Sequence, residues 1–251
     1  TIALINPAAS MRMALGEALT NMSGVVIKGL NNVQVSANWM AASGENSDDF
    51  ALRSGVEALS KIAVDLKVSI PVGKDSLSMR TKWSENNSDY EVSSPLSGVI
   101  TAMAPVDDVT ESVTPELNTS DDTSILLIKL NNKNRLAGSI FSEITETKYQ
   151  HTPDIDDIEV FEKLFSGIQN LLKSKKILAM HDISDGGLIT TLLEMCFTKK
   201  VGMRMDLDDS SGVNEFLFSE EIGVAIQIKK NNLDEIIKIL KNENLYVKNI
   251  A

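Results

Sequence analysis

The chain has 251 residues, of which 43% are hydrophobic, so it is long enough to form one large or two ordinary domains around a buried core. Its 35 acidic and 24 basic residues give a formal net charge of −11, which disfavours binding to nucleic acid or to an anionic membrane surface. A bound phosphate group would need backbone amides, a few cations or a metal ion at its own site.

Cysteine usage and hydropathy limit the cellular setting. Cys196 is the only cysteine, which excludes a disulfide framework or a cysteine-based zinc site within this chain. No stretch reaches the roughly 18 to 20 apolar residues needed to cross a bilayer, and the start carries no signal-peptide pattern. We therefore expect a cytoplasmic protein with no membrane partner. The chain opens without a methionine, on TIALINPAAS, and we expect it to be a piece of a longer protein.

The first part of the chain alternates predicted helices and strands. A helix is predicted to begin at Pro7 and to end before Gly24, because apolar residues recur at helical spacing. This apolar stripe comprises Met11, Leu15, Ala18, Leu19 and Met22. The remaining expectations are a strand at 33–40, a helix at 52–66, a brief buried strand at 68–73 and a continuous apolar strand at 97–106.

Composition changes abruptly near residues 107–122, which are acidic, rich in hydroxyl groups and contain proline. We predict a domain boundary there, between domains at 1–110 and 120–251. Beyond it, we expect strands at 124–130, 176–180, 202–207 and 223–229, and helices at 160–171, 186–199 and 233–240. Because strands and helices alternate throughout, the predicted fold class is α/β or α+β.

Glu17 and Asn21 are the first candidate ligands. They are four residues apart on the first predicted helix and lie off its apolar stripe, so their side chains are neighbours. A carboxylate and an amide carbonyl suit a hard cation such as Mg²⁺, which takes few protein ligands and keeps room for water and phosphate. A solvated helix face explains the same spacing, and this interpretation remains open.

A second candidate is the stretch VGKDSLS, at residues 72–78. It is not a phosphate-binding P-loop, because Val68 stands where that pattern needs glycine and Asp75 follows Lys74. The strand nevertheless opens into Gly73, Lys74, Asp75 and Ser76, a cation and two oxygen donors that suit an anionic substrate. A turn with a surface ion pair is an equally good interpretation.

The strongest candidate is HDISDGGL, at residues 181–188. Asp182 follows a predicted strand at its carboxyl end, the usual position for ligands in α/β folds. Gly186 and Gly187 allow a tight turn close to a ligand, and the helix that begins there offers unpaired amides. The alternative is that Ser184 or Asp185 merely caps this helix, but that leaves Asp182 unexplained.

The two histidines, His151 and His181, lie in different local contexts, so a paired-histidine metal site is not expected. His181 could act as an acid or base, but a lone histidine at a strand end is more often a hydrogen-bonded structural residue. LFSEE, at residues 217–221, is weak evidence by itself. No Gly-x-Ser-x-Gly elbow or nucleophilic cysteine signature supports acyl transfer.

Taken in order, INPAASMRMALGEALTNM, VSANWM, IPVGKDSLSM, SPLSGVITA, HDISDGGL and LFSEEIG closely resemble the second synthetase half of large, glutamine-dependent phosphoribosylformylglycinamidine synthases. The resemblance spans nearly the whole chain. The same superfamily includes aminoimidazole ribonucleotide synthetase and selenophosphate synthetase, whose glycine-rich and nucleophile-bearing segments are not found here.

The resemblance implies a two-domain synthetase unit, with an amino-terminal α/β domain whose sheets pair into a barrel and a carboxyl-terminal α/β domain. It implies a carbon–nitrogen ligase that converts formylglycinamide ribonucleotide, ATP and glutamine to the amidine. In such an enzyme ATP phosphorylates the substrate's amide oxygen, and ammonia displaces the phosphate. The implied partners are a first synthetase half and a glutaminase domain, neither of which is in this chain.

The resemblance also assigns roles to the candidate residues. Glu17, Asn21 and Asp182 look like Mg²⁺ ligands, Ser184 and Asp182 belong to the site of a bound ATP or ADP, and a further aspartate ligand is expected upstream of Thr1. In large members of the family this second nucleotide site is auxiliary, holding ADP for structural reasons. Lys74, Asp75 and Ser76 would form a wall of the substrate-facing site between the two synthetase halves.

Two hypotheses remain open: a part of the ligase that contacts substrate, and a structural module whose ADP is never turned over. We expect the isolated chain to lack catalysis, because its partner half and ammonia source are missing. Its exposed sheet edge could also allow a homodimer that imitates the pairing of two halves.

Overall fold

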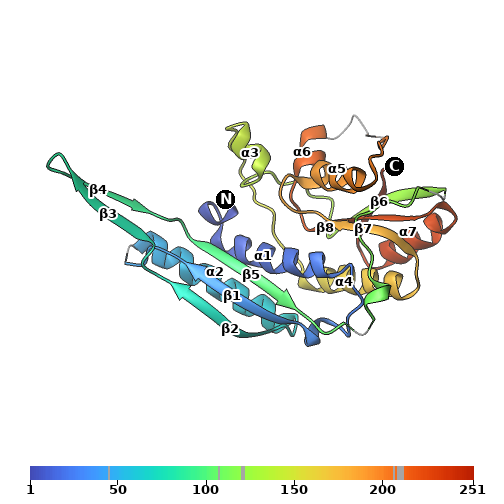
Figure 1. Cartoon of the computed structure of the whole chain (residues 1–251), viewed down its shortest axis with the longest axis horizontal. Helices are drawn as coiled ribbons and strands as arrows, with labels where there is room; N and C mark the ends of the chain where they lie inside the picture. The colour runs from blue at the N-terminus through green and yellow to red at the C-terminus, as the bar shows by residue number, and fades with distance from the viewer. Residues whose placement is uncertain (45, 107, 120–121, 206, 208–211) are drawn as a thin grey trace.

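The computed structural model describes residues 1–251 except 45, 107, 120–121, 206 and 208–211. Two sheets and seven α-helices make up the described part of the chain, together with short 3-10 turns and a two-stranded hairpin (Figure 1). The helices are α1 Pro7–Met22, α2 Asn46–Asp65, α3 Ile140–Ile144, α4 Ile158–Lys173, α5 Gly187–Lys199, α6 Val213–Phe218 and α7 Leu233–Asn242. The strands are β1 Gln34–Met40, β2 Ser69–Ser76, β3 Arg80–Glu85, β4 Ser88–Ser93, β5 Ser97–Met103, β6 Thr123–Lys129, β7 Ile177–Asp182, β8 Gly223–Lys229 and β9 Tyr246–Asn249. The predicted mixed α/β class is confirmed.

Helix α1 forms as its sequence predicts. The side chain of Asn6 accepts a hydrogen bond from the backbone N–H of Ala9 at 3.0 Å, and Pro7 occupies the first helical turn, where it costs no hydrogen bond. Met11, Leu15 and Leu19 of the apolar stripe are buried, while Ala18 and Met22 are half-buried. The opposite face of α1 is therefore left to carry polar side chains.

The first sheet has the strand order β2-β1-β5, with β1 parallel to β2 and antiparallel to β5. Buried residues of the central strand, such as Val35 and Trp39, pack in the same core as the apolar faces of α1 and α2. The other face of the sheet is open, and Val72, Val99 and Met103 are exposed there or along the edges. The predicted buried strand at 68–73 is wrong in this respect, because β2 is an edge strand covered by helices on one side only.

A hairpin made of β3 and β4 projects from this sheet (Figure 1) and was not predicted from the sequence. Asn86 and Asn87 connect its strands, and both adopt the left-handed conformation that two-residue hairpin turns require. Trp83 and Tyr90 face each other across the strands and stack at 5.3 Å between ring centroids. The Asn-Asn pair between alternating residues was the available signal for this hairpin.

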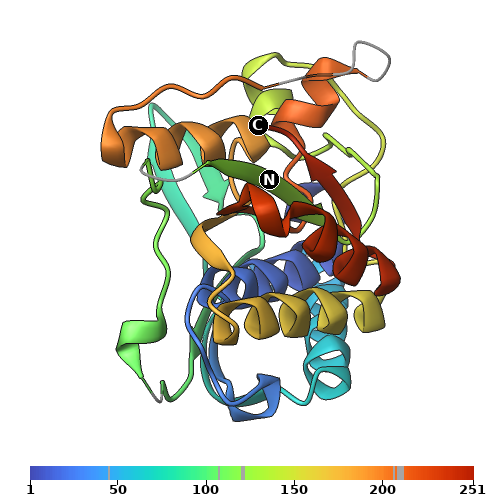
Figure 2. The same ribbon diagram turned by 90° about the vertical axis from the view of Figure 1, so that its right-hand side faces the viewer.

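The second sheet is antiparallel and has the strand order β7-β8-β6-β9. Its central strand β6 is buried on both faces: Leu126 and Ile128 join the core formed with α1 and α4, while Ile125 and Leu127 pack with α5. Helices α1 and α4 consequently lie between the two sheets in both views (Figure 1 and Figure 2). The strand predicted at 202–207 is wrong for residues 202–205 and 207, which are irregular, and residue 206 lies outside the described residues.

Polar contacts link the two halves of the molecule in addition to the shared core. Arg12 of α1 donates two hydrogen bonds to the carboxylate of Asp154, at 2.7 and 2.6 Å. The buried amide of Gln169 on α4 accepts from Ile27 N–H and donates to two carbonyls of the segment after α1. α1 is therefore held firmly against the second half. In the described part of the chain, no helix combines the length and apolar character that a membrane crossing needs.

Candidate functional site

Asp182 is the centre of the candidate site. Strand β7 continues through Asp182 rather than ending at Met180, and the side chain of Asp182 is 8% exposed. Thr191 of α5 donates from its hydroxyl to the Asp182 carbonyl at 3.0 Å, which fixes the strand end against the helix. Burial raises the pKa of Asp182, but hydrogen bonds from His181, its own backbone and Asn21 outweigh burial, so the pKa lies below its usual value.

Helix α1 brings Asn21 to this strand end. The Nδ2 group of Asn21 donates a hydrogen bond to Oδ1 of Asp182 at 3.2 Å. Helix α1 and strand β7 are in contact, so the pairing follows from the packing of α1 against the second sheet. Two of the predicted ligand residues therefore lie within one hydrogen bond of each other.

Glu17 lies one helical turn before Asn21 and faces the same region. Its pKa is raised to about 7, first because its carboxyl group loses part of its contact with water, and then through the negative charges of Asp185, Asp182 and Glu220. The structure thus brings Glu17, Asn21 and Asp182 together, and we refer to these three residues as the candidate cation site. The mutual repulsion of its carboxylates would be relieved by a cation.

His181 lies between two carboxylates. Its Nδ1 is 3.1 Å from Oδ1 of Asp182, and its Nε2 is 2.8 Å from Oε2 of Glu194 on α5. The hydrogen bond with Asp182 raises the pKa of His181, burial opposes this, and Glu194 adds to the rise. Sequence reasoning missed Glu194, because a single acidic residue within an apolar helix gives no distinctive spacing.

The glycines of HDISDGGL make a close approach to the LFSEE segment. Gly186 and Gly187 both have positive φ, at 84° and 73°, and Gly186 is the N-cap of α5. The alternative in which Ser184 or Asp185 caps this helix is wrong, because Gly186 occupies the N-cap position. A Cβ on Gly187 would lie 2.7 to 2.8 Å from backbone atoms of residues 217–219, so only glycine fits here without displacement.

Glu220 gives the LFSEE segment a structural role that its sequence alone did not indicate. It is buried, and its Oε1 accepts the backbone N–H groups of Gly186 and Ile140, both at 2.9 Å. Burial raises the pKa of Glu220, while these two backbone hydrogen bonds oppose the rise. Its neighbour Glu221 instead forms a bidentate pair with Arg135. The two glutamates therefore hold separate segments in place around the turn at 183–187.

The remaining predicted residues lie apart from this group or beside it. Ser184 is half-buried in the turn directly after Asp182. Lys74 and Asp75 are exposed and Ser76 is half-buried on β2, where they pair with residues 38–40 of β1. Because β1 separates β2 from β5, the structure does not bring Lys74, Asp75 and Ser76 together with the candidate cation site.

The donor set of the candidate cation site fits Mg²⁺. Two carboxylates and one amide are the hard oxygen donors that this ion takes, alongside water and phosphate. Across the described residues, no group of three or more His, Cys, Asp or Glu side chains is arranged to hold a metal ion by itself. A cation here would consequently need the amide oxygen of Asn21 and further oxygens from water or a nucleotide.

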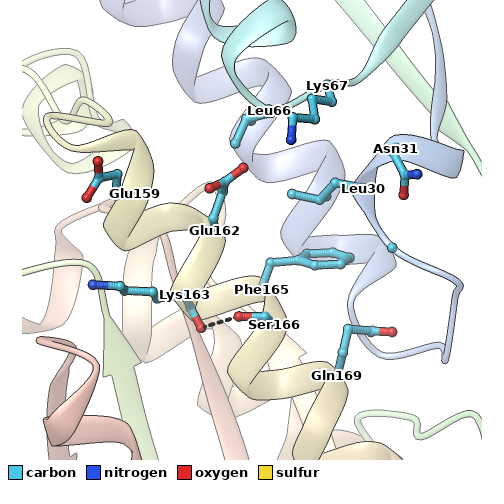
Figure 3. A pocket seen from close by; sticks show the side chains of 11 residues that line it. Leu30, Asn31, Leu66, Lys67, Glu159, Glu162, Lys163, Phe165, Ser166 and Gln169 are labelled. Atoms are coloured by element: carbon cyan, nitrogen blue, oxygen red, sulfur yellow. Dashed lines mark hydrogen bonds between the residues drawn. The ribbon is translucent and has the colours of Figure 1, made fainter.

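Two hollows are candidate binding spaces. One of about 480 Å³ lies between α1 and the edge strand β5, and both Glu17 and Asn21 line it. The other, of about 690 Å³, lies between α4 and the segments at 29–31 and 66–67 (Figure 3). Phe165 and Leu30 give the second hollow an apolar side, and none of the predicted site residues lines it. Only the first hollow adjoins the candidate cation site.

Comparisons with known proteins agree with this architecture. Residues 1–105 match the FGAR-AT PurM_N-like domain, and residues 122–251 match the C-terminal domain of AIR synthase related proteins. PurL from Thermotoga maritima complexed with ATP has a TM-score of 0.66 at 14% identity, over 99% of this chain and 37% of that one. The same protein complexed with FGAR has a TM-score of 0.69 at 12% identity, over 98% and 39%.

A third similar structure is that of HypE from E. coli, a hydrogenase maturation protein. Its TM-score is 0.62 at 13% identity, and the match covers 98% of this chain and 72% of that one. At these identities the structural matches establish the fold. The chain spans less than two fifths of the length of the PurL structures.

Proposed function

The chain belongs to the family of AIR synthase related proteins, with an FGAR-AT PurM_N-like domain before the family's C-terminal domain, and from this premise we propose that it is part of a phosphoribosylformylglycinamidine synthase. In this proposal the chain contributes a magnesium–nucleotide site of auxiliary, structural type. The complete enzyme converts formylglycinamide ribonucleotide, ATP and glutamine to the amidine.

The observation that carries the proposal is the meeting of Asn21 and Asp182 beside Glu17. Helix α1 and strand β7 come from the two matched domains, and the hydrogen bond from Asn21 Nδ2 to Asp182 Oδ1 joins them near the carboxyl group of Glu17. The structurally similar PurL has been solved with ATP, which supports a nucleotide as the ligand. We propose that the hollow between α1 and β5 receives this nucleotide and that Ser184 contacts it.

Magnesium bound here would neutralise the phosphate oxygens of the nucleotide. The residues of this chain have simpler tasks: Glu17, Asn21 and Asp182 hold the ion, while Gly186 and Gly187 keep the turn tight against residues 217–219. None of these groups needs to transfer a proton. Such a set of contacts is sufficient for retention of a nucleotide and does not by itself require turnover.

Calorimetric titration of the chain with ADP tests the proposal. With Mg²⁺ present, ADP should bind to the unaltered chain, and binding should be lost or weakened at least tenfold in Asp182→Ala, because a metal ligand is removed. Asp65→Ala, which removes an exposed carboxylate at the end of α2, is the matched control and should bind normally. Equal ADP binding by Asp182→Ala and the control would refute the assignment.

We propose a separate role for the open face of the first sheet, namely contact with the first synthetase half. Lys74, Asp75 and Ser76 are accessible on its edge strand β2, and PurL has been solved with FGAR, which supports an anionic substrate between the halves. Ammonia-dependent amidine formation by a complex of this chain with a first synthetase half should fall in Lys74→Ala. Unchanged turnover would remove these residues from the substrate site and leave the structural nucleotide site unaffected.

A further inference from the structure

The two carboxylate oxygens of Asp182 differ in their contacts with the side chains of Asn21 and His181. Asn21 Nδ2, at 3.2 Å, and His181 Nδ1, at 3.1 Å, both approach Oδ1. Protein donors from two different elements therefore hold the same oxygen. The second oxygen, Oδ2, takes part in neither of these two contacts.

His181 is itself held in place from the far side. Its Nε2 lies 2.8 Å from Oε2 of Glu194, and an ionised carboxylate can only accept a hydrogen bond. A carboxylate oxygen therefore lies against each ring nitrogen, so neither nitrogen of His181 is left for direct contact with a metal ion. A direct ligand role for His181 is excluded by the same geometry that suits it for fixing Asp182.

Helix α5 supplies the rigid support for this contact. Thr191 and Glu194 are three residues apart, so they face the same direction on the helix. Thr191 bonds the Asp182 carbonyl at 3.0 Å, while Glu194 bonds the imidazole next to it. One face of α5 therefore fixes both the backbone of Asp182 and, through His181, its carboxylate.

We infer that His181 and Glu194 are positioning residues that hold the Asp182 carboxylate with Oδ2 presented to the divalent cation. This inference rests on the proposed function, because it requires the cation to bind at Asp182. Because the pair already holds the carboxylate in one orientation, the carboxylate loses less conformational entropy when it binds the ion. Residues that orient a metal ligand in this way typically contribute about 10- to 100-fold to metal affinity.

Titration of the 251-residue chain with Mn²⁺ as the probe tests the inference, with free Mn²⁺ measured by electron paramagnetic resonance. His181→Ala should weaken Mn²⁺ binding about 10- to 100-fold. His181→Asn should recover most of the affinity, because its amide N–H can donate to Asp182 where the imidazole did. Glu194→Ala should weaken binding less, and Glu194→Gln should restore it, because its amide group keeps a hydrogen-bond partner beside Nε2.

The controls separate positioning from folding. His151→Ala removes the other, exposed histidine and should leave both Mn²⁺ affinity and the unfolding midpoint unchanged. The side chain of Glu194 is 50% exposed, so Glu194→Ala is expected to fold even if His181→Ala does not. Mn²⁺ bound at Asp182 should broaden the imidazole NMR signals of His181. The chain has two histidines, so the signals that remain in His151→Gln are those of His181.

Two failures can be told apart. If the unaltered chain binds Mn²⁺ and broadens His181 but His181→Ala or Glu194→Ala binds it equally well, the positioning role is overturned and the cation site stands. The positioning role is also overturned if His181→Asn binds Mn²⁺ as weakly as His181→Ala does. If the unaltered chain binds no Mn²⁺, or binds it without broadening His181, the proposed cation site and the positioning role both fall.

Discussion

Asn21 and Asp182 are 161 positions apart in the chain, yet Nδ2 of Asn21 donates a hydrogen bond to Oδ1 of Asp182 at 3.2 Å. The contact joins the exposed face of α1 to the end of β7. It forms because the apolar stripe of α1 is buried between the two sheets, which turns the opposite, polar face of α1 towards the tip of β7. Packing of the core thus determines where the polar donors meet.

Replacing Asn21 by aspartate should make the chain depend on divalent cations. Without Mg²⁺, Asn21→Asp exchanges a hydrogen-bond donor for a second negative charge facing Asp182, and we expect a loss of about 1 to 3 kcal/mol in the free energy of unfolding. With millimolar Mg²⁺, the added carboxylate becomes a ligand and most of the loss should be recovered. Thermal unfolding with and without Mg²⁺ measures both effects.

Asn170→Asp is the matched control for that change. Asn170 is an exposed asparagine of α4, so the new charge meets solvent and the unfolding midpoint should respond equally to Mg²⁺ in the control and in the unaltered chain. If Mg²⁺ stabilises Asn21→Asp no more than Asn170→Asp, the candidate cation site does not bind the ion.

Much of this site could be predicted from the sequence, for a definite physical reason. Glu17 and Asn21 share a helix face by spacing alone, and Asp182 follows an apolar strand, so each local position was readable. The sequence could not show that Glu194 reaches His181, because that contact depends on the angle at which α5 packs on β7. The hydrogen bonds of Glu220 to Gly186 and Ile140 depend on tertiary packing in the same way.

Removing Glu221 should cost far more stability than breaking a surface ion pair. Its carboxylate is 5% exposed and receives two hydrogen bonds from the guanidinium group of Arg135, at 2.6 and 2.8 Å. Glu221→Ala leaves a largely buried guanidinium without its main partner, and we expect a loss of about 3 kcal/mol in urea unfolding. Arg53→Ala breaks the exposed pair with Glu57, whose two charges both stay in contact with water, and should cost far less stability. Equal losses in the two variants would contradict this account.

Lys129 should make stability rise with pH above neutrality. Burial lowers the pKa of this β6 lysine to about 8, although Glu221 opposes the shift. The unfolded chain keeps the proton up to about pH 10.4, so between about pH 8 and pH 10 the unfolded state binds more protons and the free energy of unfolding increases. The contribution reaches roughly 2 kcal/mol near pH 10.

Lys129→Met removes this titration and is the variant that isolates it. Urea unfolding at pH 7.5 and pH 10 measures the free energy of unfolding of the unaltered chain and of Lys129→Met. Between pH 7.5 and pH 10, the unaltered chain should gain stability relative to Lys129→Met. Tyrosine titration affects both proteins equally, so it cancels in the comparison. Parallel pH dependence of the two proteins would show that Lys129 keeps an ordinary pKa when folded.

The limits of the fold prediction also have physical causes. An apolar run such as residues 68–73 marks a strand, but it does not say whether both faces are covered, and β2 lies at the edge of a sheet with helices on one side. Strand β9, which was not predicted, is only four residues long and finds its place by pairing with β6. The buried strands β6 and β8 were predicted correctly because continuous apolar runs are what two covered faces demand.

Adding a single methyl group at Gly187 should disturb both stability and nucleotide binding. Gly187 has a φ of 73°, and a Cβ there would lie 2.7 Å from the carbonyl carbon of Phe218 and 2.8 Å from two neighbouring carbonyl oxygens. Gly187→Ala must therefore strain the backbone and push residues 217–219 away from the turn that follows Asp182. We expect a loss of more than about 1 kcal/mol in the free energy of unfolding, together with weaker Mg²⁺-dependent binding of ADP. Gly202→Ala is the matched control, since nothing lies within 4 Å of its added Cβ and its φ is not positive. Chemical unfolding and calorimetric titration of both variants decide the matter: a Gly187→Ala chain that unfolds and binds ADP like Gly202→Ala would mean that the close approach of the two segments is not needed for the site.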